Sequence, residues 1–535
     1  MFNNETFRFG SADSSDALAI EDAGMFEQTP SSIFIGYFQG RPIFYNSPAG
    51  MVVTGGARSG KMTTFLAKNL LPGTCKQTLL VLDPKGEGAY LSQDQTPDQK
   101  FCAYWNPAAL HGLPEDRINP FGHLRIDSPT LVSDTKVTCE NFTPNSGSPQ
   151  GAYFEGRARE VGEAFCLFLA EINGVVTPPD LYLLINLIAL NNDAWLDFAF
   201  AMSESRFPLV RRIEEEIAAS RENPGAGWQG ILGELYKSFS CLSDPILMES
   251  VSPPYTMSLD QLCDSDQAWQ VYLMPPAEFI SAWSPIIKSI FVCAMAHKSR
   301  APSAPRQVWF LDECGQLANG VSGGFPLVPL MFTYGAGIGI TPVCLFQTNE
   351  QMNGLAKNAS ALISSSAGCR LMFAIRDMPS AQEASRMLGK QTLVYDDTLR
   401  QSQAAHERRS ALLGLLAGRD PVSSILSMAQ KRNETAHQAK QQRDLMTPDE
   451  VMRMPADKAL LFADGLRHPA QIDRRPYWTE LGQNFHPNPY HPPLDRVQLM
   501  TKRGPATRRI IREPVPKRFE HYPQYRDGFW SRVEE

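Results

Sequence analysis

The sequence has no C-x-x-C pair, although it contains ten cysteines. The cysteines stand singly in apolar runs such as FVCAM, LDECG and PVCLF, where a thiol is a small buried side chain. Zinc sites and redox motifs usually need paired cysteines, and disulfide scaffolds belong mostly to short secreted chains. We therefore expect free thiols and no structural zinc.

The sequence also lacks a secretory leader, a long hydrophobic run and a strong excess of one charge. Its start, MFNNETFRFGSADSSD, has neither a basic nor an apolar segment. The most apolar stretches, LYLLINLIAL and IIKSIFVCAMA, are shorter than the ~20 residues that cross a bilayer. A net charge of −7 over 535 residues argues against a surface that coats nucleic acid, although a local basic lining is possible. We expect a soluble chain that meets a membrane only through partners.

A glycine-rich stretch, TGGARSGKMTT, matches the phosphate-binding pattern G-x-x-x-x-G-K. It follows an expected strand and precedes an expected helix, so backbone N–H groups of the loop would converge on phosphate oxygens at the positive helix end. The lysine would reach the β- and γ-phosphates. A tight turn with an exposed lysine, the alternative, does not require this order of elements. The predicted nucleotide-binding residues are Gly55, Gly56, Ala57, Arg58, Ser59, Gly60, Lys61, Met62 and Thr63.

The position after Lys61 lacks the usual hydroxyl. A Ser or Thr there normally binds Mg²⁺, and this chain has Met62 instead. A thioether is a poor ligand for a hard cation that prefers oxygen. We expect water or Thr63 to take this metal position, with weaker affinity for the metal.

Two further apolar runs end in polar residues that suit the same chemistry. VWFLDE ends in Asp312 and Glu313, which in a P-loop enzyme would hold Mg²⁺ through a water and polarise the attacking water, respectively. By itself an apolar run ending in Asp-Glu usually marks only a strand that meets a turn, but its occurrence with a P-loop in a chain of buried parallel strands favours the catalytic interpretation. Another run ends in Gln347, whose amide would sense the γ-phosphate; a helix-capping role explains it equally well.

Strand-like and helical runs alternate in blocks along the chain. Polar composition predicts a linker or surface loop over Ser133–Gln150, and helical periodicity begins near Tyr153. The expected strands span 41–46, 51–55, 78–82, 101–107, 269–275, 307–313, 337–347, 367–375 and 458–465. We expect an N-terminal lead-in over 1–46 that packs on the motor domain, and a nucleotide-binding domain in two parts over 47–150 and 263–480. An all-α insertion over 151–262 separates these parts, and the second part contains a charged, variable excursion, helical or mobile, over 400–443. A basic, proline-rich, extended tail follows over 481–535.

These motifs together resemble the type IV secretion coupling proteins, the TraG/TraD-like branch of the FtsK/HerA superfamily. TGGARSGKMTTFLAKNLL, LLVLDPKGE, FLDECGQL, LFQTNEQM and RDMPSAQEASRMLGKQT are similar to successive blocks of that family. DLMTPDEVMRMPADKALLFADGLRHPAQIDRRPYW, from Asp444 to Trp478, resembles its closing block. The resemblance extends from about Phe9 to Trp478, and LDPKGE together with TPDEVMRMP is specific to this branch.

The resemblance implies an α/β, RecA-like P-loop motor domain with a mostly parallel sheet, an inserted all-α domain that selects substrate, and assembly as a hexameric ring. It also implies ATP hydrolysis with Mg²⁺ and a link from relaxase-bound DNA or protein effectors to a type IV secretion channel. Lys61 corresponds to the P-loop lysine, Asp312 and Glu313 to the acidic pair, and Gln347 to the sensor. The DPKGE turn, Asp83 to Glu87, is expected to end the strand next to the P-loop.

Two departures from the family pattern affect the prediction. Relatives often have an arginine before the Tyr-Gly of FTYGAGIG, where this chain has Thr333; Arg370, Arg376 and Arg386 are possible replacements, each also explained as an ordinary salt-bridge residue. Most relatives carry an N-terminal membrane segment that we do not find here. We therefore expect a cytoplasmic protein that reaches the inner membrane through secretion components or a separate anchor.

Other functions are compatible with the same sequence. Met62 and Thr333 favour a nucleotide-gated docking adaptor for protein effectors, with little ATP turnover. A HerA-like DNA translocase outside secretion is a further alternative, which TPDEVMRMP disfavours. The basic tail would bind DNA or anionic lipid, or else remain a solvated segment that packs on a neighbour; its charged residues include Arg508, Arg509, Arg512, Lys517 and Arg518.

Overall fold

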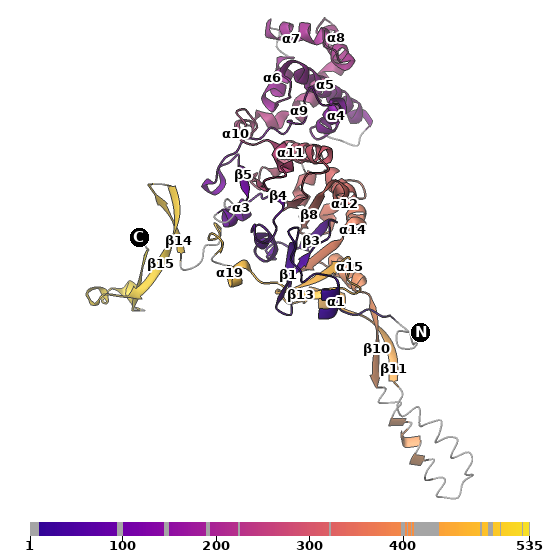
Figure 1. Ribbon diagram of the computed structural model, residues 1–535, viewed down its shortest axis with the longest axis vertical. Helices are drawn as coiled ribbons and strands as arrows, with labels where there is room; N and C mark the ends of the chain where they lie inside the picture. Colours follow the sequence, from indigo (N-terminus) through magenta and orange to yellow (C-terminus); the bar gives the residue numbers. More distant parts are fainter. Residues whose placement is uncertain are drawn as a thin grey trace.

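The buried runs of the sequence form one eleven-stranded sheet in a computed structural model of the chain (Figure 1). The strand order is β2-β1-β13-β12-β9-β3-β8-β7-β4-β6-β5. The structure describes residues 10–93, 100–143, 149–188, 193–222, 225–319, 323–396, 438–481, 484–490, 496–502, 504–526 and 528–533, with a few positions between 402 and 413.

The strands from β9 to β5 are parallel, and the strands on the other side of β9 are antiparallel. The parallel set comprises β9 (Cys369–Phe373), β3 (Met51–Gly55), β8 (Ile340–Phe346), β7 (Gln307–Leu311), β4 (Thr78–Leu82), β6 (Trp269–Leu273) and β5 (Phe101–Trp105). The antiparallel set comprises β12 (Lys458–Ala463), β13 (Ala470–Asp473), β1 (Ile33–Phe38) and β2 (Arg41–Tyr45). This confirms the predicted α/β class with a mostly parallel sheet.

The parallel strands are buried on both faces, as their near-continuous apolar sequences predict. Along β4, Leu80 and Leu82 belong to one core cluster, whereas Leu79 and Val81 belong to a second cluster on the opposite face. Because successive side chains of a strand alternate between faces, each half of the run fills a different core.

Between β5 and β6 the chain forms a block of helices at one end of the molecule (Figure 1). Because β5 and β6 pair directly, the block leaves and re-enters the sheet at one edge. It contains α4 (Leu131–Glu140), α5 (Pro149–Asn173), α6 (Pro178–Leu187), α7 (Asp193–Ser203), α8 (Pro208–Glu222), α9 (Ala226–Ser238) and α10 (Pro245–Ser250).

The surface loop predicted over Ser133–Gln150 is wrong for its first part, which belongs to α4. Leu131, Thr135, Thr138 and Cys139 are buried at helical spacing. This stripe makes α4 amphipathic, but its Thr and Cys members gave little hydrophobic signal in the sequence.

One helix of the described residues, α11 (Ile280–Arg300), is long and apolar enough to cross a membrane by length and composition. It is longer than the apolar run apparent in the sequence, and 72% of its most apolar window is buried inside the molecule. Phe291 of this helix packs against Trp309 of β7 at 5.7 Å between ring centroids, so α11 forms part of the core, as predicted for its sequence.

Two parts of the chain extend from this body (Figure 1). β10 (Lys390–Asp396) and β11 (Gln438–Asp444) form an antiparallel arm, so the last residues of the predicted helical or mobile excursion are a strand; most of 400–443 lies outside the described residues. The tail is extended, as predicted, but its strands pair into a sheet that the sequence did not indicate. That sheet contains β14 (Arg496–Thr501), β15 (Gly504–Pro514) and β16 (Phe529–Val533).

Candidate nucleotide-binding site

A cavity of about 710 Å³ opens where β3, β7 and β8 end. Crevices at the carboxyl ends of parallel strands are the usual ligand sites of such sheets. The cavity brings together the three predicted catalytic residues, Lys61, Glu313 and Gln347, which come from three separate parts of the sequence. It is lined by Ala57, Arg58, Ser59, Gly60, Lys61, Met62, Thr63, Lys85, Glu87, Asp312, Glu313 and Gln347.

The glycine-rich loop turns sharply before the helical segments η1 (Met62–Leu66) and α2 (Ala67–Asn69). Gly60 has a φ of +86°, and a Cβ there would lie 3.0 Å from the Arg474 guanidinium, so a larger residue would be both strained and crowded. Gly55 and Gly56 do not line the 710 Å³ cavity, but they accept hydrogen bonds from the Lys61 Nζ at 2.6 and 3.3 Å. The lysine is thus held by the carbonyls of its own loop.

The electrostatics of Lys61 reflect its position beside the acidic pair. Burial lowers the pKa of the ammonium, and the negative charges of Asp312 and Glu313 act in the opposite direction. A buried cation beside two carboxylates suits a site that receives a phosphate chain and a metal together.

Asp312 and Glu313 follow β7 directly, as predicted, but their environments differ. Asp312 is partly buried at the cavity wall, and desolvation of its carboxylate, with the adjacent charge of Glu313, raises its pKa to about 6. Glu313 has a φ of +52°, a left-handed backbone that is strained for a residue with a side chain. This backbone brings the Glu313 carboxylate to Gln347, whose Nε2 donates to both carboxylate oxygens at 3.1 and 2.8 Å. Gln347 thus orients Glu313, and its side chain does not cap a helix.

The donor set for Mg²⁺ is sparse but of the right chemistry. The described residues contain no group of three or more His, Cys, Asp or Glu side chains that would hold a metal alone. Asp312 and the Thr63 hydroxyl both line the cavity, and Mg²⁺ is commonly held by one or two carboxylates together with substrate phosphates and water. These oxygen donors therefore fit Mg²⁺ in the company of a nucleotide.

Met62 packs into apolar surroundings rather than contributing a metal donor. Its side chain lies against a cluster that includes Leu71, Leu91 and Tyr477. Its methyl group would be 3.3 Å from a Cβ at Gly88. The sequence showed the lost hydroxyl but not this packing role.

The DPKGE turn lies at a different place in the sheet from the one predicted. Its strand, β4, is separated from β3 by β8 and β7, and strand order of this kind is not encoded in any local motif. The turn nevertheless reaches the cavity through Lys85 and Glu87. Asp83 is fully buried, and burial raises its pKa to about 7. Its Oδ2 accepts a hydrogen bond from the Ala89 N–H at 2.8 Å, whereas its Oδ1 has no partner among the described residues.

Sequence reasoning missed Arg474, which follows β13 and holds the P-loop from outside the cavity. Its guanidinium donates to the Ser59 carbonyl at 2.5 Å and to the Thr64 hydroxyl at 2.9 Å. It also stacks over Phe373, 3.5 Å from the ring centroid. In the sequence Arg474 is one of two adjacent arginines in the closing block, and no local pattern indicates that it contacts the P-loop.

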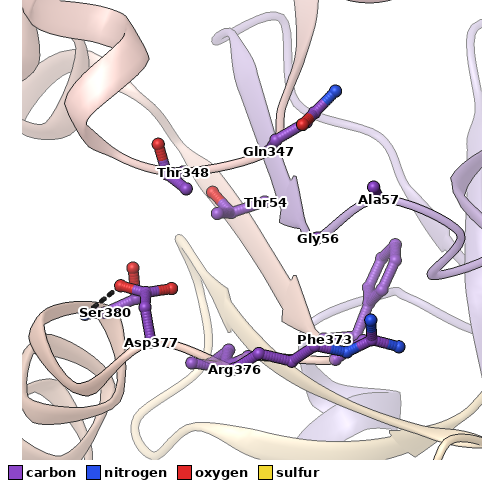
Figure 2. A pocket seen from close by; sticks show the side chains of 12 residues that line it. Thr54, Gly56, Ala57, Gln347, Thr348, Phe373, Arg376, Asp377 and Ser380 are labelled. Atoms are coloured by element: carbon purple, nitrogen blue, oxygen red, sulfur yellow. Dashed lines mark hydrogen bonds between the residues drawn. The ribbon is translucent and has the colours of Figure 1, made fainter.

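A smaller cavity of about 240 Å³ shares Ala57 and Gln347 with the larger one (Figure 2). Figure 2 shows Gly56 and Ala57 along one wall and Arg376 and Asp377 along the opposite wall. Asp377 caps helix α15 (Met378–Leu388) by accepting the Ser380 N–H at 2.9 Å. Ligand pockets usually measure about 300 to 1,000 Å³, so the larger cavity is the better fit for a nucleotide.

The three arginines considered as replacements for the residue at Thr333 lie elsewhere. Arg370 forms an ion pair with Glu383 at 2.6 Å, which confirms the salt-bridge interpretation for that residue. Arg376 lines the smaller cavity, and Arg386 lines a third one beside Lys390. In the described part of the chain, none of the three lines the 710 Å³ cavity.

Comparison with known proteins agrees with this architecture. The family model described as "Type IV secretory system Conjugative DNA transfer" matches residues 16–507. The solved structure of the bacterial conjugative coupling protein TrwBdeltaN70 with sulphate is similar with a TM-score of 0.57 at 14% identity, covering 87% of this chain and 93% of that one. TrwB in complex with the ATP analogue ADPNP gives 0.55 at 14%, and TrwB with ADP and Mg²⁺ gives 0.54 at 14%, each with the same coverage. A search of curated proteins gives no match. The structural likeness confirms the predicted RecA-like fold.

Proposed function

The chain belongs to the type IV secretory system conjugative DNA transfer family, and from this premise we propose that it hydrolyses ATP to drive a substrate to a secretion channel. The observation that carries the proposal is the convergence of Lys61, Asp312, Glu313 and Gln347 on one cavity of about 710 Å³. The TrwB structures with ADPNP and with ADP and Mg²⁺ support ATP and Mg²⁺ as the ligands.

Each residue of the site has a separate role in phosphoryl transfer. The loop N–H groups hold the phosphate chain, and Lys61 leaves its loop carbonyls to bind the β- and γ-phosphates. Glu313 orients the attacking water and accepts its proton, while Gln347 holds the carboxylate in place through two hydrogen bonds. Asp312 and Thr63 would hold Mg²⁺, which neutralises developing charge when bound.

The proposed motor assembles as a ring and carries DNA or protein substrates. A hexameric ring would place the cavity beside a neighbouring subunit, which is where we expect the missing arginine to come from. The helical block, assigned to 151–262, would select DNA-relaxase complexes or protein effectors. We place the protein in the cytoplasm, at the inner membrane through secretion components or a separate anchor protein.

The test is Mg²⁺-dependent ATP hydrolysis by the wild type and by Lys61→Ala, with and without single-stranded DNA. We expect turnover that DNA raises and that Lys61→Ala abolishes, because the lysine contacts the transferred phosphate. Lys76→Ala, at an exposed lysine beyond the loop helix, is the matched control and should retain activity.

One observation favours a second function, a nucleotide-gated docking adaptor. Met62 replaces the usual metal-binding hydroxyl with an apolar side chain that packs against a hydrophobic cluster, and a thioether would bind Mg²⁺ less well and so slow turnover. Tight ATP binding without turnover under every condition, DNA included, would favour the adaptor and contradict the motor.

A further inference from the structure

A second lysine, Lys85, lines the same cavity as Lys61. Its side chain is exposed, and among the described residues its ammonium forms no hydrogen bond or ion pair. Burial is the main cause of the lowered Lys61 pKa, and the charge of Lys85 lowers it further. The same charge lowers the pKa of Asp312 against the effect of burial. The Lys85 ammonium is therefore within electrostatic reach of both the P-loop lysine and the acidic pair.

The backbone that carries Lys85 is held on both sides. Its carbonyl accepts hydrogen bonds from the His111 Nε2 at 2.8 Å and from the Tyr490 hydroxyl at 3.0 Å. The next residue, Gly86, has a φ of +61°, and a Cβ there would lie 2.6 Å from the Met274 methyl group. The backbone is thus fixed while the side chain remains free to meet a ligand in the cavity.

The position of the turn indicates which phosphate the lysine would meet. In the sheet, β4 lies beyond β7 as seen from β3, so the DPKGE turn is on the far side of the acidic pair from the P-loop. A phosphate chain that starts in the loop and extends toward Glu313 brings its terminal group closest to this turn. The α- and β-phosphates remain with the loop, and Lys61 bridges the β- and terminal phosphates, so that the terminal group lies between Lys61 and the turn.

The charge of the cavity also favours an additional phosphate ligand. Its lining contains three cations, Arg58, Lys61 and Lys85, and three carboxylates, Glu87, Asp312 and Glu313. A triphosphate therefore adds excess negative charge to a balanced site. Thr333 occurs where an arginine was expected, and none of the three alternative arginines lines this cavity.

We propose that Lys85 binds the terminal phosphate of a nucleoside triphosphate within its own subunit, and so distinguishes ATP from ADP. This inference rests on the proposed nucleotide site, and it adds a binding residue that the sequence motifs did not assign. A lysine is suited to the task because its ammonium is a compact charge on a flexible stem.

The test compares binding of a non-hydrolysable ATP analogue and of ADP, both with Mg²⁺, by calorimetry on the full chain. Lys85→Gln should weaken binding of the ATP analogue about tenfold or more and change ADP binding less than about twofold, because charged hydrogen bonds to the terminal phosphate are lost. Lys85→Arg should retain most of the preference for the ATP analogue over ADP. Lys76→Gln is the control for removing an exposed lysine charge, and thermal melting of each variant checks folding.

Three results would count against this inference. If the binding of the ATP analogue and of ADP weakened equally, the charge of Lys85 would act on both nucleotides at a distance, without contacting the terminal phosphate. Unchanged affinity for both ligands would show that Lys85 does not contribute to nucleotide binding. A wild type that binds neither ligand would instead contradict the nucleotide site itself, and the inference with it.

Discussion

The guanidinium of Arg474 donates a hydrogen bond to the carbonyl of Ser59 at 2.5 Å, joining the closing block to the phosphate-binding loop across 415 positions of sequence. Arg474 is 4% exposed, and burial lowers its pKa to about 10, so it remains charged at neutral pH. A buried charge is tolerated only when its donors are satisfied. Here the loop carbonyl, the Thr64 hydroxyl and the Phe373 ring provide that environment.

We expect Arg474→Lys to weaken ATP binding about tenfold, because one ammonium cannot make the forked contacts to Ser59 and Thr64 that shape the loop. The melting temperature should fall as well, since acceptors of the loop lose a donor. The control is Arg475→Lys, at the adjacent, more exposed arginine that pairs with Glu480. If Arg474→Lys bound ATP with the affinity of the wild type, the loop would keep its shape without the guanidinium contacts to Ser59 and Thr64.

Removing the Glu313 carboxylate should separate binding from chemistry. We expect Glu313→Gln to lower kcat about 100-fold or more and to leave ATP affinity within about threefold, because general bases contribute roughly 10² to 10⁴ in rate. Gln347→Glu should act similarly, since a second carboxylate would repel Glu313 from its place. Steady-state hydrolysis and nucleotide binding on the same preparations test this, with Glu350→Gln, at an exposed glutamate, as the control. Full activity in Glu313→Gln would assign the base elsewhere, with Glu87 of the same cavity the next candidate.

The sequence predicted the parts of this site that are local in the chain. The loop at Gly55–Lys61 carries its chemistry in a few adjacent residues, so its spacing predicted it. The acidic pair after β7 was predicted because the same chain contains a P-loop. The contacts of Arg474 and of the Lys85 carbonyl with Tyr490 depend on strand order and on segments hundreds of residues apart. Helix α4 was missed for another reason, because Thr and Cys at its buried positions look polar in a composition window.

Restoring the missing hydroxyl should strengthen metal binding. We expect Met62→Ser to lower the Mg²⁺ concentration for half-maximal hydrolysis severalfold, because an oxygen ligand replaces a thioether. The same change should reduce stability by about 2 kcal/mol, since Met62 packs beside Leu71 and Leu91. Met62→Leu, which keeps the packing without a hydroxyl, is the control. An unchanged Mg²⁺ requirement in Met62→Ser would mean that Thr63 or water already supplies that ligand fully.

The buried Asp83 makes the stability of the free protein depend on pH. Its pKa is raised from the usual 3.8 to about 7, first by burial and then by the nearby charge of Asp312. Between these values the folded chain holds a proton that the unfolded chain has released. Stability should therefore be greatest below about pH 4 for this group and fall as pH rises toward 7, by about 1.4 kcal/mol per pH unit.

Asp83→Asn removes this titration and should make the protein more stable than the wild type at pH 8, by up to about 4 kcal/mol, with the difference shrinking toward pH 5. Thermal melting of the nucleotide-free protein at both pH values measures it, and Asp22→Asn, at an exposed aspartate, controls for the charge change. The opposite sign, a variant less stable than the wild type at pH 8 as well as at pH 5, would mean that the ionised Asp83 is stabilised in the folded chain. The Oδ1 atom, which has no partner in the part of the chain that the structure describes, argues for the first result, because a buried carboxylate oxygen that accepts no hydrogen bond favours the protonated form.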